Sequence, residues 1–160
     1  MFRRSLPLFA YIALISLCAA SQAAERKISK DALPAAVQKT AAAQSAGATV
    51  TGYSQDREGG QLEYEVEMTV AGHSKDVTIA PDGQLLEVEE QVNLAALPAD
   101  VQAGLHKKAG HGKAGHGVIT KVESLTKHGA LVAYEAQVRN GARHFEVQVG
   151  PQGQTLAHEE

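Results

Sequence analysis

Apolar and polar residues alternate along the whole of one segment, Leu62-Glu63-Tyr64-Glu65-Val66-Glu67-Met68-Thr69-Val70, and this alternation decides the fold. Successive side chains of a β-strand point to opposite faces of a sheet, so the segment predicts a strand with one buried face and one acidic face. The same period of two returns at residues 132–139, where Val132, Tyr134, Ala136 and Val138 are the apolar positions. The chain therefore contains at least two half-buried strands of the same type.

The second strand belongs to an internal repeat. Leu33-Pro34-Ala35-Ala36-Val37-Gln38 returns as Leu97-Pro98-Ala99-Asp100-Val101-Gln102, and Tyr64-Glu65 and Gly83-Gln84 return 70 positions later as Tyr134-Glu135 and Gly153-Gln154. The offset grows from 64 to 70, so the second copy has six extra residues between Gln102 and Gly117, an interval that contains a small tandem duplication, Lys108–Gly112 followed by the identical Lys113–Gly117. Repetition at a fixed offset indicates two copies of one structural unit.

Each copy predicts a helix followed by strands. Proline at the first helical turn and apolar residues at i and i+4 predict helices at 34–45 and 98–108. The strands that follow end in Pro-Asp-Gly or Pro-Gln-Gly turns, with last strands expected around Leu86–Val88 and Leu156. We therefore expect an α+β protein built from two tandem αββββ units, each with its helix packed on an antiparallel sheet.

The order of these motifs resembles the PepSY-like domain family. The resemblance rests on the Leu-Pro helix start, Gly47-Ala48-Thr49-Val50, the Tyr64-Glu65-Val66 strand and Asp82-Gly83-Gln84-Leu85-Leu86. This family is related in architecture to the repeats of beta-lactamase inhibitory proteins. The resemblance implies a periplasmic or secreted domain that lacks catalytic machinery and binds or inhibits proteases or other envelope proteins, and it implies no functional residue.

The first residues predict export. Arg3 and Arg4 precede the apolar run Leu6–Ala20, and Ser21-Gln22-Ala23 provides the small residues of a signal-peptidase site before Ala24. We therefore expect a signal peptide at residues 1–23, a linker at 24–30, a first PepSY-like unit at 31–90, and a second unit at 95–160 with a His/Gly/Lys loop at 106–117. The expected location is the periplasm or the cell exterior, with no membrane contact after cleavage.

Charge is divided unevenly between the copies. Residues 31–90 contain 11 acidic and 3 basic residues, whereas residues 95–160 contain 6 acidic and 7 basic residues. An acidic balance makes a nucleic acid an unsuitable partner. Either the surfaces have drifted apart, or the acidic strand face with Glu63, Glu65 and Glu67 meets a basic partner.

Histidines gather in the second copy, where His106, His111 and His116 are spaced by five residues. Imidazole is a common ligand of zinc, copper and nickel. A spacing of five brings these side chains together on neither a helix nor a strand, and the surrounding glycines predict a loop. The alternatives are thus a solvated loop and a divalent-metal site.

These observations favour a binding protein over an enzyme. The sequence contains no nucleophile elbow, phosphate-binding glycine loop or His-Glu-x-x-His motif, so we expect no enzymatic activity and no cofactor. The hypothesis is an exported, non-enzymatic binding module of the bacterial envelope, whose partner is an envelope or secreted protein such as a protease. The alternative is a periplasmic metal-binding protein that uses the histidine loop.

Overall fold

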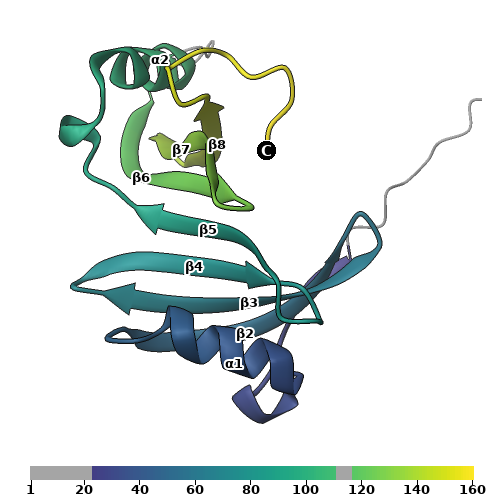
Figure 1. The fold of residues 1–160 in the computed structure, drawn as a ribbon. Helices are drawn as coiled ribbons and strands as arrows, with labels where there is room; N and C mark the ends of the chain where they lie inside the picture. Colours follow the sequence, from purple (N-terminus) through teal and green to yellow (C-terminus); the bar gives the residue numbers. More distant parts are fainter. Residues whose placement is uncertain (1–22, 111–116) are drawn as a thin grey trace, which may run out of the picture.

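One continuous antiparallel sheet organises the protein (Figure 1). The computed structural model describes residues 23–110 and 117–160, and within these residues eight strands pair in sequence order from β1 to β8. The strands are β1 (Ala23–Lys27), β2 (Thr49–Glu58), β3 (Gln61–Val70), β4 (His73–Ile79), β5 (Leu85–Gln91), β6 (Val118–Lys127), β7 (Ala130–Asn140) and β8 (Arg143–Val149). The expected signal peptide lies almost entirely outside the described residues.

The two predicted helices are present. They are α1 (Ala35–Gln44) and α2 (Ala99–Gly110), each preceded by a short 3₁₀ turn at Lys30–Ala32 and Leu94–Ala96. The repeated glutamine of the helix motif has the same role in both copies, because the Gln38 Nε2 donates to the Leu33 carbonyl at 2.9 Å and the Gln102 Nε2 to the Leu97 carbonyl at 2.8 Å. Each bond satisfies a carbonyl just before its helix.

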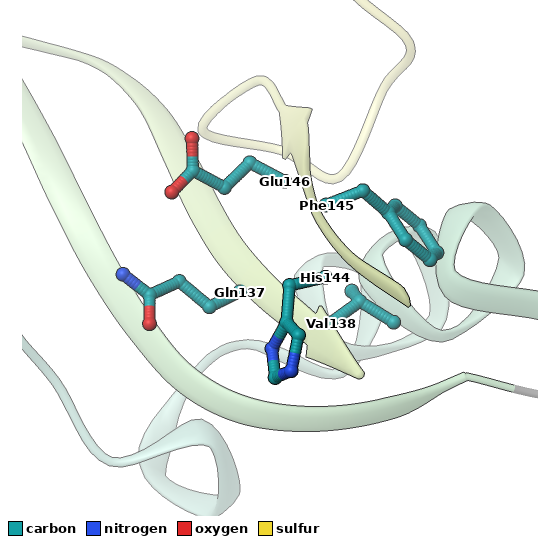
Figure 2. Close-up of a pocket in the computed structure, with 5 residues that line it drawn as sticks. All are labelled: Gln137, Val138, His144, Phe145 and Glu146. Carbon is teal, nitrogen blue, oxygen red and sulfur yellow. The ribbon is translucent and has the colours of Figure 1, made fainter. Parts of the chain in front are cut away.

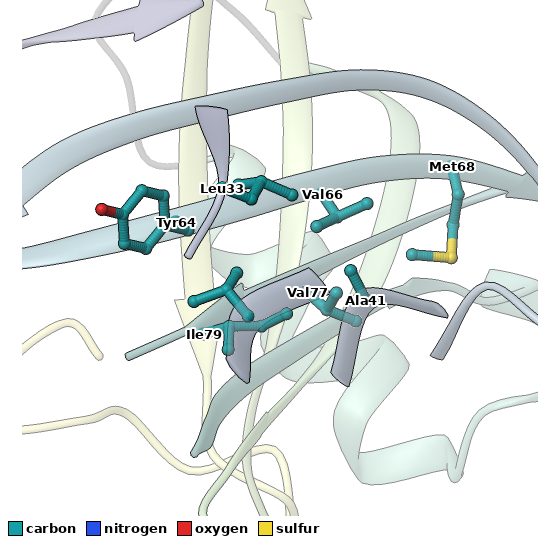
Figure 3. Packing of buried hydrophobic residues seen from close by; sticks show 8 residues of the cluster. Leu33, Ala41, Tyr64, Val66, Met68, Val77 and Ile79 are labelled. Carbon is teal, nitrogen blue, oxygen red and sulfur yellow. The ribbon is translucent and has the colours of Figure 1, made fainter. Parts of the chain in front are cut away.

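Both helices cover the same face of the sheet. In the first half, Val37 and Ala41 of α1 pack on Val66, Val77 and their neighbours, as Figure 3 shows for most of this cluster. In the second half, α2 packs on β6, β7 and β8 through the cluster Val101, Leu105, Ala109, Val122, Ala136, Val138, Val147 and Val149. The strand register keeps this face on one side of the sheet from one half to the other, since Val88 of β5 lies opposite Thr126 of β6, although the apolar residues form two separate clusters. Figure 1 shows α1 and α2 at opposite ends of the molecule with the strands between them, so the sheet curves around its helix-free face.

The predicted pair of separate αββββ units is wrong. β5, the last strand of the first half, pairs with β6 of the second half from Glu87 opposite Lys127 to Gln91 opposite Glu123. A separate first unit would leave the outer backbone N–H and C=O groups of β5 unpaired at an exposed edge. Pairing with β6 satisfies them and joins the halves in one sheet.

Two local predictions also need correction. The strand expected around Leu156 is absent, because residues after the Pro151 turn leave the sheet. The matching strand β5 contains Leu85, Leu86 and Val88, whereas Leu156 is the one large apolar residue of the 154–160 segment. The expected linker at 24–30 instead contributes most of β1, which pairs with β2 at the edge of the sheet.

The repeated turn has a packing role that the two halves share. A Cβ atom on Gly83 would lie 2.8 Å from the carbonyl oxygen of Ala36 in α1, and one on Gly153 would collide with the carbonyl oxygen of Asp100 in α2. Both glycines have positive φ, +90° and +77°. Each turn therefore needs glycine both for its backbone conformation and for close approach to the first turn of a helix.

Within residues 23–110 and 117–160, neither helix has the length and apolar character that crossing a bilayer requires.

Candidate functional site

The helix-free face of the sheet is lined with carboxylates. Alternation along β3 sends Tyr64, Val66 and Met68 toward α1 and the intervening glutamates to the opposite side. The strand register continues this opposite side across the sheet, since Glu67 faces Asp76, which in turn faces Glu89. We call this surface the acidic face; its carboxylates include Asp56, Glu63, Glu65, Glu67, Asp76, Glu87, Glu89, Glu123, Glu135 and Glu146.

The acidic face is crowded although no helix covers it. Leu125 is 2% exposed and Ala133 is 0% exposed, and both lie on this side. Ser54, Glu123 and Gln148 are buried there as well. Side chains on a flat, uncovered sheet face would be largely solvated, so their burial agrees with a concave surface whose side chains cover one another.

Crowding raises the pKa of most of these carboxyl groups. Burial is the largest cause in each case, and repulsion from neighbouring carboxylates adds to it for most of them. The groups with raised pKa values are Asp56, Glu63, Glu65, Asp76, Glu87, Glu89 and Glu135. Glu89 is affected most, with a pKa raised from 4.5 to about 8 by burial and by the charges of Glu87, Glu123, Glu135 and Asp76.

The highest density of negative charge lies where the two halves join. Carboxylate oxygens of Asp76 on β4, Glu89 on β5 and Glu123 on β6 lie within 4.8 Å of one another, and we call these three residues the seam cluster. The Lys121 Nζ lies 2.6 Å from the Glu123 Oε1, and the Ser74 hydroxyl donates to the same oxygen at 3.2 Å. The negative charge of Glu123 is thus balanced by Lys121. Asp76 and Glu89 form no ion pair with any of the described residues.

A small hollow of about 230 Å³ opens beside the seam. It is lined by the tip of the β2–β3 hairpin, by Glu63, and by the first residues of β5 next to the β6–β7 turn. Glu87 and Lys127 form an ion pair there at 3.5 Å. Further along, a hollow of about 420 Å³ lies at the β7–β8 hairpin, where Gln137, His144 and Glu146 point to the same side (Figure 2).

The predicted partner-binding residues lie together on the acidic face. Glu65 accepts a hydrogen bond from the Ser54 hydroxyl at 3.1 Å, and Glu67 passes over Gly52, where a Cβ would meet its Oε2 at 2.8 Å. Glu63 lines the seam hollow. Oxygens of Glu25, Glu65 and Glu67 also come within 4.8 Å of one another, but acidic groups of this kind are common without an ion, and we assign no metal to them or to the seam cluster.

The predicted histidine site is only partly described. α2 continues to Gly110, so His106 lies on an exposed part of this helix rather than in a loop. His111 and His116 lie outside the described residues. Metal binding by these histidines stays a prediction.

The seam cluster was not predicted from the sequence. Asp76, Glu89 and Glu123 come from three strands, and only their register brings them together. The available signal was the alternation in Glu87-Val88-Glu89, which assigns both glutamates to the face opposite Val88. This alternation predicts a strand with one acidic face, but it does not predict that the strand pairs with β6.

Comparison with known proteins gives a fold and no sequence family. No family model and no curated protein matches the chain. Solved structures from Bacteroides do match. A protein of Bacteroides eggerthii, provisionally described as periplasmic, is 18% identical with a TM-score of 0.59, over 78% of this chain and 86% of the other.

Two further crystal structures agree. A DUF2874 family protein of Bacteroides ovatus is 20% identical with a TM-score of 0.57, over 78% of this chain and 84% of the other. A BLIP-like protein of Bacteroides fragilis is 19% identical with a TM-score of 0.54, over 79% of this chain and 85% of the other. The chain has a BLIP-like architecture. Sequence identities this low support a shared fold and not a shared function.

Proposed function

We propose that the chain is an exported, non-enzymatic binding module of the bacterial envelope, and that it binds a basic segment of a partner protein on its acidic face. The observation that supports this most directly is the set of crowded carboxylates on a concave sheet face without a covering helix. Raised pKa values show that ionising these groups is costly, and a cationic partner would lower that cost.

Export and location rest on other observations. Residues 1–23 have the basic start, apolar run and small-residue site of a signal peptide. The Bacteroides eggerthii structure of the same fold is of a protein provisionally described as periplasmic. The proposed location is therefore the periplasm or the cell exterior. A protease or other envelope enzyme bound on this face would be sequestered or inhibited, as the BLIP-like fold suggests.

The proposal includes the origin of the two halves. Shared glutamine bonds before each helix and shared glycine contacts after β4 and β8 support a tandem duplication of one PepSY-like unit, at 31–90 and 95–160. In this view the outer edge of β5, which would be unpaired in a single unit, pairs with β6 and joins the two units.

Photo-crosslinking in envelope extract tests the binding face. A photoreactive residue at Thr78 would sit in the middle of the acidic face, and one at Lys39 would sit on the exposed side of α1. We expect a discrete crosslinked partner from position 78, lost when Glu65 and Glu67 are changed to lysine, and none from position 39. Equal crosslinking from both positions would refute the acidic face as the binding site.

The alternative is metal binding by the histidine loop. Calorimetric titration of the mature chain with zinc and copper tests it, with His106→Ala, His111→Ala and His116→Ala as the variants. Saturable binding that these substitutions abolish would favour the metal-binding function.

A further inference from the structure

The seam cluster has more negative charge than its surroundings neutralise. It combines three carboxylates with one contacting ammonium group, that of Lys121, which already pairs with Glu123. The next cation, Lys127, pairs with Glu87. Asp76 and Glu89 are left facing each other across paired strands, with Glu123 beside them.

Carboxylates on four strands surround Glu89 and oppose its ionisation. Asp76 faces it from β4, and Glu87 lies on its own strand and shares a side-chain hydrogen bond with it. Glu123 with its partner Lys121 lies on β6, and Glu135 lies on β7. Its cross-strand neighbour on β6 is the buried Leu125, which offers no hydrogen bond and excludes water. Carboxylates so close to one another do not all ionise, so the cluster retains a proton under conditions where isolated glutamates have lost theirs.

We propose that docking of a cationic partner on the acidic face displaces a proton from the seam cluster, so that the module exchanges a proton for a partner's guanidinium or ammonium group and binds more tightly as the pH rises. This inference rests on the proposed function. The exchange balances simply: the carboxylic acid loses H⁺ to the solvent, and the resulting carboxylate pairs with the incoming cation. No covalent bond other than O–H changes.

The occupant that fits is an extended basic segment of a protein. The carboxylates follow a line across successive strands, from Glu65 and Glu67 through Asp76 to Glu89 and Glu123. Neighbouring strands lie about 4.8 Å apart and same-side side chains of an extended peptide about 6.8 Å apart, so the long, flexible side chains of arginine or lysine can each reach one or two carboxylates along this line. Arginine suits the seam best, because its planar guanidinium can serve two carboxylates at once.

The linkage has a calculable size. If the carboxyl group of Glu89 has its pKa near 8 in the free protein and is ionised in the complex, raising the pH from 7.0 to 8.5 should tighten binding roughly eightfold. At pH 7.5 about three quarters of a proton should leave per peptide bound. This range lies above the ordinary pKa of histidine, about 6.5, and an N-acetylated, amidated hexa-arginine peptide keeps its charge throughout it.

Isothermal titration calorimetry with this peptide tests the proposal. The wild-type chain lacking residues 1–23 is titrated at pH 7.0 and 8.5, and at pH 7.5 in phosphate and in Tris, whose different ionisation enthalpies reveal proton release. We expect the eightfold tightening and a buffer-dependent heat. Glu89→Gln should still bind the peptide, with a pH effect below about twofold and no proton release. Glu90→Gln, on the opposite face of the same strand, should behave as wild type.

The outcomes separate the inference from the function on which it rests. No binding of the peptide at any pH, or binding unaffected by Glu65→Gln and Glu67→Gln together, would overturn the acidic face as a binding site and the exchange with it. Binding that depends on those two residues but has the same affinity at both pH values would overturn the exchange alone. Proton release on addition of calcium chloride without peptide would also overturn it, because the cluster would then serve a metal ion.

Discussion

Replacing Glu89 by glutamine should stabilise the protein at neutral and alkaline pH. Glutamine keeps the size and hydrogen-bonding capacity of the side chain but has no charge to bury among Asp76, Glu123 and Glu135. In the unfolded chain the carboxyl group ionises near its ordinary pKa of 4.5, whereas in the folded chain it does so only near pH 8. Below pH 4.5 the group is protonated in both states, and the folded protein incurs no penalty.

The sign and size follow from linkage. Between pH 4.5 and about 8 the unfolded state releases a proton that the folded state retains, so the free energy of unfolding falls as the pH rises through this window. A pKa difference of this size can change the free energy of unfolding by at most about 5 kcal/mol. Glu89 is only partly buried, and screening by solvent reduces the expected gain of Glu89→Gln to about 2 kcal/mol at pH 8.5 and close to zero at pH 4.5.

Urea denaturation of both proteins at pH 4.5, 6.5 and 8.5 measures this gain. Glu90→Gln is the matched control, since it removes the adjacent charge at an exposed position on the opposite side of β5 and should change stability by less than about 0.5 kcal/mol at every pH. A gain from Glu89→Gln that is the same at pH 4.5 and 8.5 would refute the reasoning, because an effect independent of pH cannot arise from a raised pKa. So would a loss of stability at pH 8.5.

Other substitutions test the packing. Val66→Ala, at a position 0% exposed beneath α1, should lower the free energy of unfolding by about 2 kcal/mol, while Val118→Ala, at a position 57% exposed, should change it by less than about 0.5 kcal/mol; urea melts at pH 6.5 compare them. Gly129→Ala should cost about 1 kcal/mol for its positive φ alone, whereas Gly153→Ala should cost at least about 2 kcal/mol more, because its Cβ would collide with the Asp100 carbonyl in α2. Equal losses of unfolding free energy from the two glycine substitutions in the same melts would show that the Gly153 turn can move away from α2 at no cost.

Local structure was readable from the sequence because its causes are local. The Leu-Pro start and the i, i+4 apolar residues predicted α1 and α2 to within a few residues. Alternation at 62–70 predicted β3 and assigned Glu63, Glu65 and Glu67 to the polar side. These features depend on neighbours a few positions away along the chain.

Pairing between distant strands was not readable, and the site depends on it. Nothing in the sequence of β5 says that its outer edge meets β6, because any exposed strand edge offers the same backbone groups. The seam cluster exists only through this register, which sets Glu123 one strand from Glu89 and two from Asp76. A slip of one residue would send the β6 side chain to the opposite face and dissolve the cluster.

The sequence repeat matches shared packing contacts between turn and helix, but it does not match the same set of strands in both halves. After β8, the turn bond from the Gly150 N–H to the Gln154 carbonyl, at 2.8 Å, matches the bond from the Ala80 N–H to the Gln84 carbonyl, at 2.9 Å. Yet the segment after Gln84 forms a strand, and the segment after Gln154 does not. In both halves the turn glycine packs on the helix, whereas only in the first half does a strand follow, β5, which has a partner strand on each side. Matching motifs in the two halves therefore predict shared contacts with the helix, and the shared sheet has to be established from the structure.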